Sequence, residues 1–138
     1  MSIDLYLEDE NGVALGEVLD PDDLTERVVA LAAHGGTTCL RFVHPEGNTV
    51  FNQLQIPTLA RELEAARAFV TEERLVTLGR CELASAVEAR WNAAVIRAIE
   101  LRNQNTRATD VRAHLERILE LATQARGKAH TYLKFYGD

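Results

Sequence analysis

The side chains that could do chemistry in this chain are mostly carboxylates, and they crowd its first quarter. Residues 1–34 carry nine Asp or Glu against one base, Arg27, which is a net charge of −8. Residues 35–138 carry twelve acids and fourteen bases, which is a net charge of +2. The acids of the first segment are Asp4, Glu8, Asp9, Glu10, Glu17, Asp20, Asp22, Asp23 and Glu26. Carboxylates this dense repel phosphate backbones and attract cations or basic protein surfaces.

Three of these acids stand at a predicted helix start. In Asp20-Pro21-Asp22-Asp23, Asp20 suits the capping position and Pro21 suits the first helical position. Acids are also favoured there by the positive end of the helix dipole. Capping is the simpler interpretation of Asp20, Asp22 and Asp23, and a cation site or a partner contact is the alternative.

The other reactive side chains form no recognisable catalytic or cofactor motif. Ser85 and Thr58 have no neighbouring base, and no Gly-x-Ser-x-Gly surrounds a serine. His34, Cys39 and His44 are five residues apart in turn, which is not a zinc spacing. We therefore predict no enzyme activity, no metal and no cofactor.

Alternation of apolar and polar residues predicts strands at both ends of the chain. Residues 3–8 and residues 131–136 each alternate with period two. The second of these strands needs a partner, since its backbone groups would otherwise stay unsatisfied. The N-terminal strand or a central hairpin is the expected partner.

The middle of the chain predicts that hairpin. Residues 37–43 and 49–54 are rich in β-forming residues and flank the turn sequence at 44–48. A four-residue loop would pair Phe42 with Phe51, and a five-residue loop would pair Phe42 with Val50. The sequence leaves both registers open.

Four apolar stripes at helical spacing predict four helices. The first follows Asp20 and ends at Gly35-Gly36, and the second begins at Pro57. After Gly79 the third covers about residues 82–103, with Trp91 on its apolar stripe and so predicted in the core. The fourth covers about 109–126. The predicted fold is one α+β domain over residues 1–138: a small, mostly antiparallel sheet of three to five strands packed by about four helices.

The second face of that sheet is the predicted binding surface. If the apolar residues of the terminal strands face the helices, the tyrosines between them face away. Tyrosines beside fixed charges have the composition of a protein interface. The alternative is a face that is merely solvated, or that residues 9–19 cover. The predicted partner-binding residues are Asp4, Tyr6, Glu8, Asp9, Glu10, Asp22, Asp23, Arg41, Tyr132, Lys134 and Tyr136.

Two segments carry a resemblance to known proteins. The residues LRF at 40–42 and GNTVFNQLQ at 47–55 resemble a hairpin of small bacterial proteins, and HTYLKFYGD at 130–138 resembles their C-terminal ending. Proteins of this kind are associated with the immunity proteins that neutralise polymorphic toxins. The resemblance implies an inhibitor that occludes a toxin's active site, and it assigns no individual residue.

We therefore expect a non-enzymatic protein-binding module, most concretely an immunity or antitoxin-type inhibitor of a basic toxin domain. One alternative is a self-associating protein that dimerises through its third and fourth helices. Another is a ligand-binding protein or enzyme with a pocket lined by Trp91, Arg41 and a histidine. Interleaved acids disfavour nucleic-acid binding, and no apolar run reaches the length of a membrane span. The first residues lack the features of a secretory signal, so the bacterial cytoplasm is the expected compartment.

Overall fold

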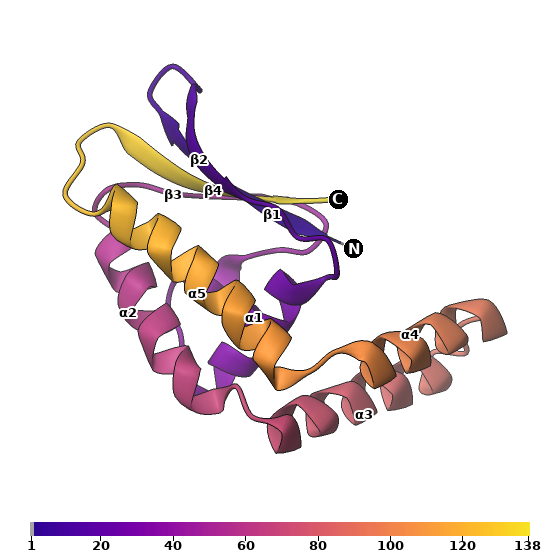
Figure 1. The fold of residues 1–138 in the computed structure, drawn as a ribbon. Coiled ribbons are helices and arrows are strands. Elements are labelled where there is room, and N and C mark those ends of the chain that lie inside the picture. Colours follow the sequence, from indigo (N-terminus) through magenta and orange to yellow (C-terminus); the bar gives the residue numbers. More distant parts are fainter. Residues whose placement is uncertain (1) are drawn as a thin grey trace.

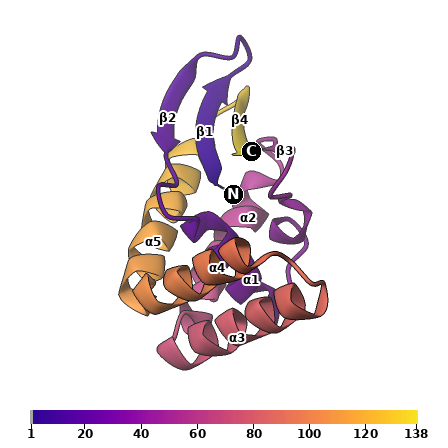
Figure 2. The ribbon, with the colours of Figure 1, turned by 90° about the vertical axis from the view of Figure 1, so that its right-hand side faces the viewer.

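The two predicted terminal strands lie side by side at the centre of the sheet. In the computed structural model, which describes residues 2–138, β1 (Ile3–Asp9) pairs antiparallel with β4 (Thr131–Gly137). β2 (Ala14–Val18) pairs with the other edge of β1, and β3 (Asn48–Phe51) pairs with the other edge of β4. The strand order is β2-β1-β4-β3, with every pair antiparallel. Figure 1 shows the sheet nearly edge-on, and Figure 2 shows the strands in this order. The predicted small α+β fold is confirmed.

The helices divide into a layer on the sheet and an arm that leaves it. α1 (Leu24–Ala32), α2 (Ile56–Ala66) and α5 (Ala108–Ala125) cover one face of the sheet. α3 (Glu72–Glu88) and α4 (Ala93–Asn105) form a helical hairpin, the arm, which projects from this layer (Figures 1 and 2). Short 3-10 turns lie at Ala33–Gly35, Leu40–Phe42 and Arg67–Phe69. None of the helices within residues 2–138 has both the length and the apolar character that a membrane crossing requires.

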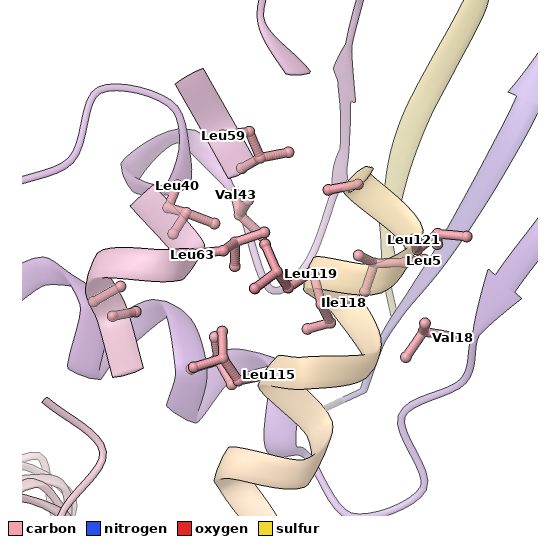
Figure 3. Packing of buried hydrophobic residues seen from close by; sticks show 14 of the residues in the cluster. Leu5, Val18, Leu40, Val43, Leu59, Leu63, Leu115, Ile118, Leu119 and Leu121 are labelled. Carbon is pink, nitrogen blue, oxygen red and sulfur yellow. The ribbon is translucent and has the colours of Figure 1, made fainter. Parts of the chain in front are cut away.

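The core lies between the sheet and the layer of α1, α2 and α5. Leu5 and Phe135 point into it from the central strands, as the alternation predicts. Leu63 on α2 and Leu115 and Ile118 on α5 meet them, and none of these side chains is more than 1% exposed. Figure 3 shows how the side chains from these elements converge. Burial of this kind contributes about 2 kcal/mol for each large aliphatic side chain, so it is the main source of stability.

The predicted central hairpin is wrong. Residues 37–43 form no strand, and Phe42 pairs with neither Phe51 nor Val50, because β3 pairs with β4 instead. The cause is the carboxylate of Glu62 on α2, which accepts hydrogen bonds from the backbone N–H groups of residues 38–40, at 3.0 Å from both Cys39 and Leu40. Burial alone would raise the pKa of Glu62, but these backbone donors together hold it below its usual value. Backbone N–H groups that are bonded to a carboxylate cannot also donate to a neighbouring β-strand.

The predicted third helix also has the wrong boundaries. Gly79, taken from the sequence as a helix break, lies inside α3, where an added Cβ would come within 2.9 Å of Asn103 on α4. Glycine therefore permits the two helices of the arm to approach closely. The second and third helices are instead separated by the 3-10 turn at Arg67–Phe69, and α3 begins at Glu72. A further break falls at Arg90, whose φ is 58°, inside the predicted third helix, and Trp91 follows it with 53% of its surface exposed. The prediction that Trp91 belongs to the core is wrong.

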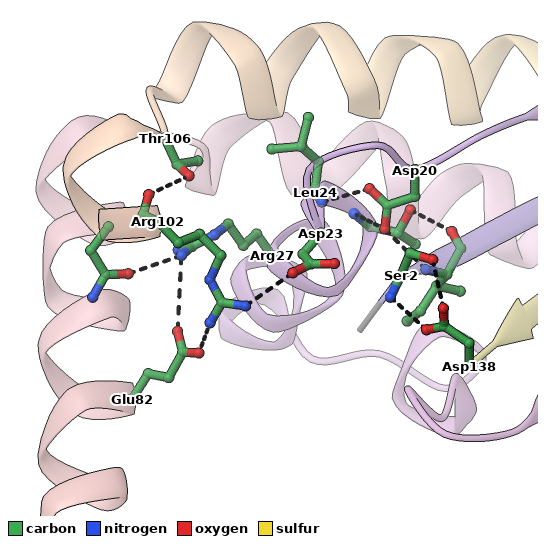
Figure 4. Close-up of polar contacts among 12 residues, drawn as sticks. Ser2, Asp20, Asp23, Leu24, Arg27, Glu82, Arg102, Thr106 and Asp138 are labelled. Carbon is green, nitrogen blue, oxygen red and sulfur yellow. Dashed lines mark hydrogen bonds and ion pairs between the residues drawn. The ribbon is translucent and has the colours of Figure 1, made fainter. Parts of the chain in front are cut away.

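Asp20 caps α1 although it lies four residues before the first residue of the helix. It is 4% exposed, and its carboxylate accepts from the backbone N–H groups of Ile3 at 3.0 Å, Leu24 at 2.6 Å and Thr25 at 3.3 Å (Figure 4). The helix begins at Leu24, so Pro21 is not its first residue, and Asp23 stands at the cap position without a capping side-chain bond. One buried carboxylate therefore ties the start of β1 to the start of α1.

We expect Asp20→Ala to lower the free energy of unfolding by about 3 kcal/mol or more, because three backbone donors lose a charged acceptor. Urea unfolding followed by circular dichroism measures this. The control is Asp22→Ala, an exposed acid of the same segment, which should stay within about 0.5 kcal/mol of the parent protein. Equal effects of the two substitutions would contradict the role assigned to Asp20.

Candidate binding surfaces

The face of the sheet opposite the helices carries most of the predicted binding residues. Three come from β1 and three from β4, in the register that pairs Asp4 with Tyr136, Tyr6 with Lys134, and Glu8 with Tyr132. Figure 1 shows no helix of the described chain over this face. The structure thus brings together six of the predicted residues, and residues 9–19 do not cover them, because β2 extends the sheet sideways. We call this surface the open face: Asp4, Tyr6, Glu8, Tyr132, Lys134 and Tyr136.

Glu8 is the centre of the open face. It is 8% exposed, and it accepts a hydrogen bond of 2.8 Å from the Tyr136 hydroxyl. Its carboxylate also lies 3.4 Å from Lys134 Nζ. The ring of Tyr6 packs edge-on against that of Tyr136, with centroids 5.4 Å apart. These contacts hold the aromatic side chains in fixed positions before any partner arrives, which lowers the entropy lost on binding.

The carboxylate of Glu8 also changes the acidity of its neighbour. The hydrogen bond from Tyr136 to Glu8, followed by burial and the negative charge of Glu8, raises the pKa of Tyr136, and Lys134 opposes the shift. The tyrosine hydroxyl is therefore held in its protonated, donating form.

The open face has an excess of negative charge. Glu17 on β2 stands opposite Tyr6 and is exposed, so it adds to Asp4 and Glu8 against Lys134 alone. One carboxylate oxygen of Asp4 is already engaged within the fold, because it accepts a hydrogen bond of 2.8 Å from the backbone N–H of Asp20. Glu17 could not be placed on this face from the sequence, because Gly16 and the β-bulge at residues 14–16 break the alternation of β2.

The other predicted binding residues lie elsewhere. Asp9 shapes the β1–β2 turn by accepting from the backbone N–H groups of Asn11 and Val13, each at 2.9 Å. Glu10, next to it, is exposed and lies 3.7 Å from His130. The expectation that Arg41 joins the strands is wrong, because it lies in a 3-10 turn with its guanidinium 4.9 Å from the Phe42 ring centre.

Asp22 and Asp23 lie at the junction of α1 with the arm, which we call the elbow. Arg102 on α4 pairs with Asp23 at 3.2 Å and with Glu82 on α3 (Figure 4). Arg27 on α1 donates to Asn103 at 2.9 Å, and burial and the neighbouring Arg102 lower its pKa. Asp22 is exposed beside this network. The acids of the first segment are therefore divided between the open face, its β1–β2 end and the elbow.

A buried His–Thr–Asp group has the residue types of a catalytic site but not its access. His114 on α5 is 0% exposed, with Nε2 2.7 Å from Thr25 Oγ1 and 3.9 Å from Asp20 Oδ1. The Thr25 hydroxyl donates to the carbonyl of Ile3, so His114 Nε2 must be the donor to Thr25. Arg117 then donates to Nδ1 at 3.3 Å. This arrangement satisfies a neutral imidazole and fastens α5 to α1 and β1.

Neither a search of the described residues for metal ligands nor a comparison with known proteins identifies a further site. Among residues 2–138, no group of three or more His, Cys, Asp or Glu side chains is placed to hold a metal ion. A comparison of the chain with protein-family models, curated proteins and solved structures finds no match.

We expect Glu8→Gln to lower the pKa of Tyr136 towards its ordinary value, because the charged acceptor is removed while the shape is kept. NMR titration of the Tyr136 ring signals measures the shift directly. Glu10→Gln removes an equal charge at the end of the strand and serves as the control. An unchanged Tyr136 titration in Glu8→Gln would contradict the hydrogen bond assigned here.

We expect the free energy of unfolding to fall as the pH drops below about 6.5, because the unfolded chain then protonates His114 and the folded one resists it. Burial and Arg117 lower the pKa of His114, and Asp20 only partly opposes them. The loss should approach about 1 kcal/mol between about pH 7 and 5.5. His114→Gln should flatten this part of the profile, and His44→Gln, at an exposed position, should not. A profile that His114→Gln leaves unchanged would rule out His114 as its source.

Proposed function

We propose that this protein is a non-enzymatic binding module whose contact surface is the open face. The observation that carries the proposal is a sheet face without a covering helix that carries Tyr6, Tyr132 and Tyr136. Tyr136 is held by its hydrogen bond to the nearly buried Glu8, and Tyr6 packs against the Tyr136 ring. Tyrosine gives a large contact area at a low cost in side-chain entropy, and it is enriched at protein interfaces. A preorganised face of this kind suits a folded protein partner.

The charge of the surface favours a basic partner. Glu17 and Asp4 flank the tyrosines, and Glu10 extends the acidic region at the end of β1. Complementary charge steers the encounter of two proteins and mainly raises the association rate. Nucleic acid is disfavoured by the same argument, because its phosphates would meet carboxylates.

The specific form of the proposal is an immunity-type inhibitor that covers the active site of a basic toxin domain in the bacterial cytoplasm. Its support is the resemblance in sequence of residues 40–42, 47–55 and 130–138 to small bacterial proteins associated with toxin immunity, although the hairpin implied for the first two segments does not form. The strands in the last two of these segments, β3 and β4, pair with each other, and β4 supplies half of the open face. An inhibitor that protects its own cell would act in the compartment where the toxin acts.

The test uses the product of the gene that lies beside this one, co-expressed and co-purified with the full chain. We expect a complex whose association rate falls steeply with added salt. Glu17→Lys should slow association by about tenfold, because it reverses a charge on the open face. Glu120→Lys reverses the charge of another exposed acid, on α5, and should have a much smaller effect.

The tyrosines should mainly change the dissociation rate of the complex, in contrast to the charged residues. Tyr132→Ala should weaken the complex by about 2 kcal/mol, the loss typical of a central aromatic contact. Tyr132 makes no side-chain hydrogen bond within residues 2–138, so its removal should leave the fold intact, which circular dichroism checks. A complex that ignores both Glu17→Lys and Tyr132→Ala would show that the partner binds another surface.

A further inference from the structure

A groove with an apolar floor lies in the elbow, between α1 and the arm. Its volume is about 580 Å³. Trp91, Val95 and Ala98 form the floor, and Leu78 joins them from α3. Val95 and Ala98 lie three residues apart on one face of α4, and Trp91, in the turn just before this helix, continues their apolar surface towards the tip. Trp91 is 53% and Val95 39% exposed, so this surface is uncovered.

The elbow end of the groove has an excess of negative charge, because three acids line it against two arginines. Its two arginines, Arg27 and Arg102, are engaged by Asn103, Asp23 and Glu82. Glu26 stands on the α1 wall and, in the part of the chain that the structure describes, makes no hydrogen bond or ion pair. An occupant that fits here presents an apolar group together with a cation.

The tip of the arm carries those two groups side by side. Arg90 and Trp91 form the turn between α3 and α4, and both are exposed. Arg90 holds a φ of 58°, fixed by hydrogen bonds from its own N–H to the Val87 carbonyl and from the Trp91 N–H to the Ala86 carbonyl, each 3.1 Å. The guanidinium of Arg90 has no hydrogen-bond or ion-pair partner within residues 2–138. The tip is therefore a preformed apolar and cationic contact.

We propose that the groove is filled by a second copy of this chain, in a symmetric dimer whose α4 helices pack antiparallel. Antiparallel packing places each tip at the other copy's elbow, so Trp91 covers the apolar floor of the partner subunit. Arg90 then faces Glu26 of the partner subunit, and a two-fold axis repeats each contact. The cationic tip and the acidic elbow are separated by the length of the arm in every copy, and this matching separation favours a second copy over an unrelated helix.

The single tryptophan of the chain reports on this interface directly. We expect sedimentation equilibrium to show a monomer–dimer equilibrium in the micromolar range, as is usual for a small interface. The Trp91 emission should shift to shorter wavelength over the same concentrations, because dimerisation removes its ring from water. A monomer at every concentration, with unchanged emission, overturns the proposal.

Substitutions separate this interface from a general loss of stability. Trp91→Ala should weaken dimerisation by at least about tenfold, since aromatic anchors dominate such contacts. Leu101→Ala is the control, because Leu101 is 41% exposed on a different face of α4 and should leave dimerisation unchanged. Equal effects of the two, or a dimer that persists in Trp91→Ala, would overturn the proposal.

A charge exchange tests the orientation of the helices. Arg90→Glu and Glu26→Arg should each weaken the dimer, because each places like charges together, and the double variant should recover most of the loss. A double variant as weak as the sum of the two single ones contradicts the antiparallel arrangement. Should the gene neighbour bind the elbow and shift Trp91 emission while the chain stays monomeric, the occupant is that partner and not a second copy. The tests of Glu17 and Tyr132 on the open face are independent of every outcome here.

Discussion

The pairing of β1 with β4 is the constraint on which the rest of the structure depends. Seven residue pairs join the two ends of the chain, and the Ser2 N–H adds a hydrogen bond of 2.7 Å to the Asp138 carboxylate. Its register sends Leu5 and Phe135 to the core and leaves Tyr6 and Tyr136 on the open face. A slip of one residue would exchange the two sets. The hydrophobic core and the proposed binding surface are therefore two results of the same alignment.

The elements that follow from local sequence were predictable, and those decided by distant side chains were not. Period-two alternation identified β1 and β4, and apolar stripes identified the helices that cover them. The hairpin at residues 37–54 failed because Glu62, far along the chain, claims the backbone donors of residues 38–40. Gly79 was misjudged for a related reason: its contact with Asn103 exists only after α3 and α4 have met. Such competitors have no local signature.

The candidate surfaces show the same division. Tyr6, Tyr132 and Tyr136 share a face because strand geometry alone puts them there, so the sequence was enough. The role of Trp91 depended on where a long apolar stripe breaks, and a non-glycine residue, Arg90, makes that break with a positive φ. The acids that were predicted to form one binding surface lie apart because several of them are used within the fold. Asp20 and Asp9 accept hydrogen bonds from backbone N–H groups, and Asp23 forms an ion pair with Arg102.

The arm leaves and rejoins the rest of the protein at almost the same point. Glu72, at the start of α3, accepts a hydrogen bond of 2.7 Å from the backbone N–H of Ala108, where α5 begins. Residues 72–105 thus form an insertion whose two ends are already neighbours, and most of its packing is between its own helices. The path of the chain from α2 to α5 therefore does not depend on the length of the arm, and shortening its tip need not displace either helix. Its base is different, because Asn103 there accepts a hydrogen bond from the buried Arg27 of α1.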